Sequence, residues 1–184
     1  MEHKGTAYLE TERLILRPFE SEDLLAMYTN WCSDERVTEF LRWPAHNDIS
    51  ITEMVLEDWV RSYSDERFYQ WAIVLKGAAR PIGTISVVEQ HELAEKMQIG
   101  FCVGYDWWNK GYTSEAFRRV IQYLFEEVKV QRIEAQHAPE NVNSGKVMTS
   151  CGLKYEGTLR KADYSNKGIV DACIYSILLD EYNA

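Results

Sequence analysis

The most informative part of the chain is the segment Gly104-Tyr105-Asp106-Trp107-Trp108-Asn109-Lys110-Gly111-Tyr112-Thr113-Ser114-Glu115. An apolar, strand-like run precedes it, and the most periodic element of the sequence follows it. In that element apolar side chains recur at i, i+3, i+4, i+7, i+8 and i+11: Phe117, Val120, Ile121, Leu124, Phe125 and Val128. This spacing is typical of a long amphipathic helix. The segment therefore predicts a strand, a short loop and the N-terminus of a helix.

The junction between this loop and helix has the properties of an anion site. The first backbone N–H groups of a helix lack partners within the helix, and the helix dipole adds about half a positive charge there. A phosphate or pyrophosphate is the natural ligand of such an end. Gly111 allows close approach of a ligand to the backbone, and Thr113 and Ser114 offer hydroxyl groups. From the residues alone, an ordinary helix N-cap remains an equally valid interpretation.

Two familiar nucleotide motifs do not fit this region. A Walker A loop requires Gly-Lys-Ser/Thr, whereas here Lys110 precedes Gly111. Gly100-x-x-x-Gly104 is not the Gly-x-Gly-x-x-Gly fingerprint of dinucleotide-binding proteins. A small nucleotide-binding switch is therefore a weak alternative.

The rest of the chain predicts one mixed α/β (α+β) domain over residues 1–184. Apolar runs bounded by turn residues indicate seven strands, the second to fourth of which form an antiparallel meander: 13–17, 68–75, 82–88, 97–103, 132–137, 153–159 and 169–179. Helical spacing and capping residues indicate helices that start near 21–23, at 50–62 and at 143–151. We expect irregular structure at 34–48, a polar connection at 90–95 and a loop at 161–168. The prediction is a mixed, mostly antiparallel sheet of about seven strands, flanked by helices.

Composition excludes several classes of protein. The 184 residues carry 20 Lys and Arg against 29 Asp and Glu, a formal net charge of −9 with histidine neutral. Such a surface repels phosphate backbones, so we expect no nucleic acid partner. No stretch approaches roughly 18 apolar residues, and residues 1–10 lack the apolar core of a signal peptide. We therefore expect a cytoplasmic protein without a membrane partner.

The four cysteines do not suggest metal or redox chemistry. Cys32, Cys102, Cys151 and Cys173 form no CxxC pair and no cluster with histidine. We expect buried free thiols and no metal site.

The order of motifs along the chain resembles the GNAT superfamily of N-acetyltransferases, and within it the RimJ/RimL-like branch. The superfamily's acyl-CoA pyrophosphate loop follows Arg/Gln-x-x-Gly-x-Gly/Ala, and this branch commonly has Trp-Gly-Lys-Gly-Tyr-Ala. Trp108-Asn109-Lys110-Gly111-Tyr112-Thr113 resembles that loop. Four further segments resemble the branch: 11–18, Ile99-Gly100-Phe101, Asn141-Val142-Asn143-Ser144 and 151–157. The match covers nearly the whole chain in the right order.

The resemblance implies acetyl-CoA as cosubstrate and a role for each matching position. The strand 99–103 would pair its backbone with the pantetheine arm, which assigns cofactor binding to Ile99, Phe101, Cys102 and Val103. The loop amides would hold the pyrophosphate, which adds Trp108, Asn109, Lys110, Gly111, Tyr112, Thr113 and Ser114. Asn141 would hydrogen-bond the pantetheine and Ser144 would lie near the thioester sulfur; these two are the candidate catalytic residues. Both are also typical helix-capping residues.

Three positions depart from the family pattern. Trp108 stands where the superfamily has Arg or Gln, Gln98 stands where many relatives have a Glu that serves as general base, and Met148 stands where many have a Tyr that protonates the leaving thiolate. An amide and a thioether cannot transfer protons. Glu89, His91 and His137 are candidates for proton relay or substrate contact, although ordinary solvated or packed roles suit them as well.

The missing base favours an acceptor that loses its proton easily. Neutralising a lysine amine of pKa about 10.4 at pH 7 costs roughly 4–5 kcal/mol, whereas an α-amine near 7.7–8.0 costs only about 1–1.4 kcal/mol.

We therefore expect an acetyl-CoA-dependent N-acetyltransferase of a primary amine, with the N-terminal α-amine of a protein (ribosomal-protein type) as one candidate acceptor. No Cys/His/Asp arrangement indicates a covalent intermediate, so direct transfer in a ternary complex is expected. A small amine such as a polyamine or aminoglycoside is an alternative acceptor. A non-catalytic acyl-CoA-binding or sensing module is an alternative function, and a second copy of the chain is a candidate partner.

Overall fold

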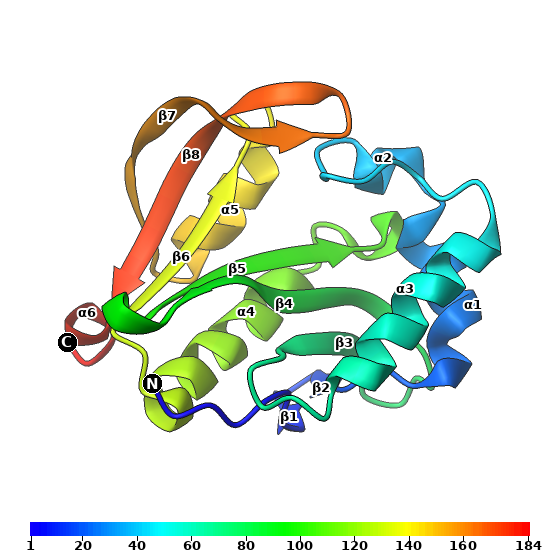
Figure 1. Ribbon diagram of the computed structural model, residues 1–184, viewed down its shortest axis with the longest axis horizontal. Helices are drawn as coiled ribbons and strands as arrows, with labels where there is room; N and C mark the ends of the chain where they lie inside the picture. The colour runs from blue at the N-terminus through cyan, green and yellow to red at the C-terminus, as the bar shows by residue number, and fades with distance from the viewer.

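The computed structural model describes residues 1–184, and its centre is one eight-stranded sheet in the order β1-β2-β3-β4-β5-β6-β8-β7 (Figure 1). The strands are β1 (Leu9–Glu10), β2 (Leu14–Arg17), β3 (Gln70–Leu75), β4 (Pro81–His91), β5 (Lys96–Val103), β6 (Arg132–His137), β7 (Lys154–Ser165) and β8 (Gly168–Leu178). Only the β5–β6 pair is parallel. The predicted mixed, mostly antiparallel sheet is confirmed. The eighth strand is β1, which sequence reasoning missed because it contains only two residues.

Helices cover both faces of this sheet. They are α1 (Leu24–Met27), α2 (Glu35–Thr38), α3 (Ile49–Ser62), α4 (Tyr112–Tyr123), α5 (Val142–Ser150) and α6 (Leu179–Tyr182). The alternation of β3 separates the two cores: Trp71 and Ile73 join the 26-residue core that contains α4, whereas Ala72 and Val74 join the nine-residue core beneath α1 and α3. None of the helices is long and apolar enough to cross a membrane.

The helix predicted from the apolar periodicity is present, but its last turn is not α-helical. α4 ends at Tyr123, and a π-helical turn over Leu124–Val128 continues it to a left-handed Lys129 (φ 63°). Phe117, Val120 and Leu124 are fully buried, as the spacing requires. The predicted apolar face thus anchors α4 to the sheet and fixes the position of the loop before it.

The sheet opens between its two parallel strands. β5 and β6 pair only where Lys96–Gln98 face Arg132–Glu134, and beyond that point the strands diverge (Figure 1). The residues 99–103 keep β4 as a partner on one side and have no ladder partner on the β6 side. One half of β5 therefore presents unpaired backbone groups to the interior of the opening.

Two predicted irregular segments are wrong in part. The expected loop at 161–168 is strand as far as Ser165, because a bulge between Leu159 and Asp163, with Lys161 left-handed (φ 51°), restores pairing with β8. The expected irregular segment at 34–48 contains α2, which begins where the side chain of Asp34 caps the amide of Arg36. The predicted polar connection at 90–95 is also shorter, because β4 runs to His91.

The tip of the β7–β8 hairpin lies against the segment that follows α2 (Figure 1). The Asn166 side-chain amide donates hydrogen bonds to the carbonyl oxygens of Thr38, Leu41 and Trp43, at 2.7, 2.8 and 3.2 Å. These contacts bring residues about 125 positions apart in the chain into one layer above the opening.

Candidate active site

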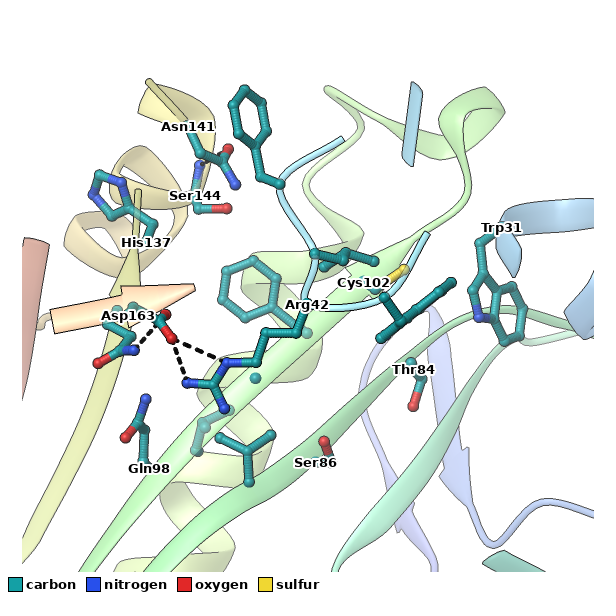
Figure 2. Close-up of a pocket in the computed structure, with 18 of the residues that line it drawn as sticks. Trp31, Arg42, Thr84, Ser86, Gln98, Cys102, His137, Asn141, Ser144 and Asp163 are labelled. Carbon is teal, nitrogen blue, oxygen red and sulfur yellow. Dashed lines mark hydrogen bonds and ion pairs between the residues drawn. The ribbon is translucent and has the colours of Figure 1, made fainter. Parts of the chain in front are cut away.

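A cavity of about 500 Å³ occupies the opening between β5 and β6 and extends under the hairpin tip. Its floor includes Ile99, Gly100, Phe101 and Cys102 of β5, and its wall on the other side includes residues of β6 and α5 (Figure 2). Side chains from α1, α3 and the segment after α2 close the far end. Val103, the last of the four residues of this strand to which the resemblance assigns cofactor binding, does not line the cavity.

The loop between β5 and α4 carries a row of backbone donors without acceptors. The amides of residues 109–114 make no hydrogen bond to any other group of the protein. Gly111 is the N-cap of α4 with φ 79°, and Asn109 is also left-handed with φ 58°. Successive N–H groups in such conformations form a concave anion-binding array, and the helix dipole adds positive potential to it. The loop thus presents unpaired amides at the place where the sequence predicts an anion site.

The side chains of Trp108 and Ser114 form hydrogen bonds within the protein that stabilise the loop. The Trp108 indole N–H donates to the Val103 carbonyl oxygen at 2.7 Å, which ties the loop to the end of β5. The Ser114 hydroxyl lies 2.8 Å from that of Ser150, which in turn donates to the Val147 carbonyl oxygen. The Ser114 proton is therefore used within the protein. Backbone amides, not these side chains, are the free donors of the loop.

The ion pair between Arg13 and Glu115 stabilises the loop between β5 and α4. Sequence reasoning did not predict this pair. The Glu115 carboxylate accepts hydrogen bonds from the Arg13 Nε at 2.6 Å, the Arg13 amide at 2.9 Å and the Thr11 hydroxyl at 2.5 Å. Arg13 also donates to the Lys110 carbonyl oxygen at 3.1 Å and lies over the Tyr112 ring. Burial raises the pKa of Glu115, but the hydrogen bonds from Thr11 and Arg13 outweigh it and the pKa is lowered.

The start of α5 points at the other wall of the cavity. The Asn141 side-chain oxygen caps the helix by accepting from the Ser144 amide at 3.4 Å, and both residues line the cavity (Figure 2). The Asn141 amide nitrogen and the Ser144 hydroxyl make no hydrogen bond within the protein, so both remain available to a ligand. Gly145 lets this helix approach β6, because a Cβ there would lie 2.7 Å from His137 Nε2. Asn141 therefore caps the helix and also faces the cavity.

The sequence candidates for proton transfer are mostly remote or blocked. Glu89 and His91 do not line the cavity, and the His91 ring accepts a hydrogen bond from the Ala94 amide. His137 lines the cavity, but its Nδ1 donates to the Ala138 carbonyl oxygen at 2.7 Å and its Nε2 is buried without a hydrogen-bond partner. Gln98 and Met148 do line the cavity, as the family pattern implies.

Buried thiols are not nucleophiles here. Burial raises the pKa of Cys32 to about 12 and places the pKa of Cys102 well above its usual range, so both line the cavity as neutral thiols. All four cysteines are buried and free, as the sequence predicts.

Of the six tryptophans, Trp31, Trp43 and Trp59 line the cavity.

One further polar cluster lies over the cavity, and sequence reasoning did not predict the contacts within it. The Asp163 carboxylate accepts from Arg42 Nε and Nη2 at 3.1 and 2.8 Å, and from Gln136 Nε2 at 2.6 Å (Figure 2). Arg42 and Asp163 are 121 residues apart, and the bulge in β7 brings them together. No local pattern could have indicated the pair.

Comparisons with known proteins agree with this geometry. Residues 13–154 match the family description "Acetyltransferase (GNAT) domain". The uncharacterized N-acetyltransferase p20 of Bacillus licheniformis is 31% identical over 176 residues, which cover 95% of this chain and 97% of p20. The solved GNAT-family acetyltransferase from Bacillus anthracis has a TM-score of 0.83 at 26% identity, over 95% of this chain and 99% of that one.

A third structure shares the fold at lower identity. RimL, a ribosomal L7/L12 α-N-protein acetyltransferase solved in complex with coenzyme A, has a TM-score of 0.81 at 16% identity, over 93% of this chain and 97% of its own. Because the family description spans most of the chain and the p20 similarity is nearly end to end, the chain is an acyltransferase that belongs to the GNAT family.

Proposed function

We propose that the protein transfers the acetyl group of acetyl-CoA directly to a primary amine. The observation that carries this proposal is the row of six amides at 109–114 without acceptors, at one end of the opening in the sheet. The diphosphate is the part of acetyl-CoA that such a row fits. The complex of the RimL fold relative with coenzyme A supports the choice of ligand.

The rest of the cosubstrate follows from the shape of the opening. With its diphosphate at 109–114, the pantetheine arm would run along the unpaired edge of β5 and hydrogen-bond its backbone as an added strand would. The Asn141 amide would bond this arm from the opposite wall. The thioester would then lie in the cavity near the Ser144 hydroxyl.

The acetyl transfer requires few side-chain groups. The nitrogen lone pair of a neutral amine attacks the thioester carbonyl carbon, and a backbone N–H of β5 stabilises the oxyanion that forms. The carbon–sulfur bond then breaks, the Ser144 hydroxyl would donate its proton to the thiolate, and the proton lost by the attacking nitrogen would restore the hydroxyl. Much of the acceleration comes from holding both reactants in one cavity.

The acceptor must attack as the neutral amine, so an amine that enters the cavity as its ammonium has to lose a proton there first. Gln98 replaces the family's carboxylate base, so an amine with a low pKa suits the site. An α-amine costs only about 1–1.4 kcal/mol to neutralise at pH 7. The α-amine of an amino-acyl group therefore fits better than a lysine side chain.

Calorimetry and thiol release test this proposal together. We expect acetyl-CoA to bind, and a panel of free amines and peptides with free N-termini to release CoA thiol above the buffer rate. If acetyl-CoA does not bind, the proposal is wrong. Binding without transfer to any acceptor would favour the second candidate, a non-catalytic acyl-CoA-binding module, which Gln98 and Met148 in the cavity wall favour.

A further inference from the structure

We propose that Asp163 binds the ammonium group of the acceptor, and that the acceptor is a small primary amine with an apolar body. This inference rests on the proposed function and names the substrate class of that site. The chain has 29 acidic residues, yet Asp163 is the only carboxylate among the side chains that line the cavity. An amine that arrives as a cation needs such a partner, because burial of an unpaired charge is costly.

The position of Asp163 suits this role. Its partner Gln136 lies on β6 two residues beyond Glu134, the last residue of that strand to pair with β5. The carboxylate therefore lies over the opening, where the thioester is expected. Figure 2 shows Gln98 on the same side of the cavity. An ammonium held by Asp163 would be next to the acyl group.

The carboxylate keeps room for one more donor. A carboxylate accepts about four hydrogen bonds. Arg42 supplies two, both to Oδ1, and Gln136 supplies one to Oδ2. Oδ2 therefore has an unused lone pair. The Asp163 side chain is 16% exposed and that of Arg42 is 45% exposed, so the acid is held in place while its basic partner reaches solvent.

Apolar side chains make up more than half of the cavity lining and suit an apolar body of the amine. Six of them come from the part of the chain before β3: Met27, Phe40, Leu41, Trp43, Val55 and Trp59. Burial lowers the pKa of His46, another lining residue, so it is neutral and adds no positive charge. An aromatic or aliphatic body gains contact here, whereas a second cation would lose hydration without a second acidic partner.

The hairpin tip limits the size of the acceptor. Asn166 joins it to the segment after α2, and a Lys167–Glu39 ion pair of 3.2 Å adds a second connection. Together with the Arg42–Asp163 pair, these bonds hold the hairpin tip over part of the cavity. The cavity of about 500 Å³ must also hold the acyl end of the cosubstrate, so the space left fits a small molecule.

The test measures binding of two probes to the CoA-saturated protein by calorimetry at pH 7. The probes are 2-phenylethylammonium and its neutral isostere 2-phenylethanol. Asp163→Asn should weaken binding of the ammonium by about 10- to 100-fold, the range of one charge-assisted hydrogen bond, and leave the alcohol unaffected. Asp163→Glu should retain ammonium binding. Asp180→Asn, which removes the same charge outside the cavity, is the matched control.

Arg42→Gln distinguishes binding of the ammonium by Asp163 from a purely structural role of the Arg42–Asp163 ion pair. It removes the competing cation while Gln136 still holds the carboxylate, so the ammonium should bind at least as tightly as to the wild type. Equal loss in Arg42→Gln and Asp163→Asn would overturn the proposal, because a structural tie predicts that result. If Asp163→Asn does not fold, Arg42→Gln still tests the proposal. Weaker binding of the ammonium than of the alcohol by Arg42→Gln, relative to the wild type, would then contradict it.

The two proposals fail in different ways. A protein that binds CoA but not 2-phenylethylammonium overturns the substrate class and leaves the acetyltransferase proposal in place. A protein that does not bind CoA overturns both. Ammonium binding that Asp163→Asn does not weaken overturns the role of Asp163 alone.

Discussion

Replacement of Gly111 by alanine should weaken acetyl-CoA binding with little loss of fold. Gly111 is the left-handed N-cap of α4, with φ 79°. An added Cβ would come no closer than 3.4 Å to Arg13 Nη2, an ordinary contact. The variant therefore isolates the backbone cost of the left-handed conformation from any steric clash.

The size of the effect follows from that cost. A left-handed conformation costs an L-residue roughly 1–2 kcal/mol. The free variant can relax the loop, but binding must restore the conformation that aims the amides of 109–114 at the ligand. The cost then appears in the affinity, as a loss of about 5- to 30-fold.

Calorimetry with CoA provides the assay, and Gly77→Ala provides the control. Gly77 has φ 85° and nothing within 4 Å of an added Cβ, so it carries the same strain in a remote turn. It should lose unfolding free energy and bind CoA like the wild type. If Gly111→Ala binds CoA as tightly as Gly77→Ala does, the loop does not hold the ligand as argued here.

Three further substitutions test other parts of the site and fold. Asn141→Asp keeps the oxygen that caps α5 but not the amide donor, so unfolding free energy should stay within about 0.5 kcal/mol while acetyl-CoA affinity falls about tenfold; unchanged affinity would make Asn141 a cap only. Gly145→Ala should lower the melting temperature, because its Cβ would meet His137 Nε2 at 2.7 Å, and His137→Ala in the same chain should restore part of the loss; no restoration would contradict that contact. Hydrogen bonds from Arg132 lower the pKa of Glu156 to about 2, so its charge stabilises the fold above about pH 4.5 and this contribution disappears as the pH falls toward 2. The gap in unfolding free energy between wild type and Glu156→Gln should narrow over that range, and a constant gap would contradict the pairing.

The parts of the fold that sequence reasoning predicted are those that neighbouring residues encode. Apolar spacing predicts the helix of 112–128, which the structure divides into α4 and a π-helical turn. β6 has the predicted bounds. The end of β7 was not predictable in the same way, because the polar run at 160–163 is typical of a loop. Residues 160–162 form the bulge, and pairing with β8 resumes at Asp163 and extends β7 to Ser165.

The residues of the candidate site also differ in whether neighbouring residues in the sequence determine their positions. The row of amides at 109–114 is local, since one loop and one helix end create it, and the sequence indicated it. The brace of Arg13 on Glu115 joins residues 102 positions apart, and the Arg42–Asp163 pair joins residues 121 apart. Only the arrangement of strands brings these side chains together. The unpaired amides of the loop could therefore be predicted from sequence, whereas the Arg13–Glu115 and Arg42–Asp163 pairs required the structure.

A crystal structure of the protein with acetyl-CoA tests the role of residues 109–114 most directly. We expect diphosphate oxygens at about 2.7–3.2 Å from several of these amide nitrogens, with the thioester over the unpaired half of β5. A diphosphate bound elsewhere, with the same amides still lacking acceptors, would contradict the proposed cosubstrate site.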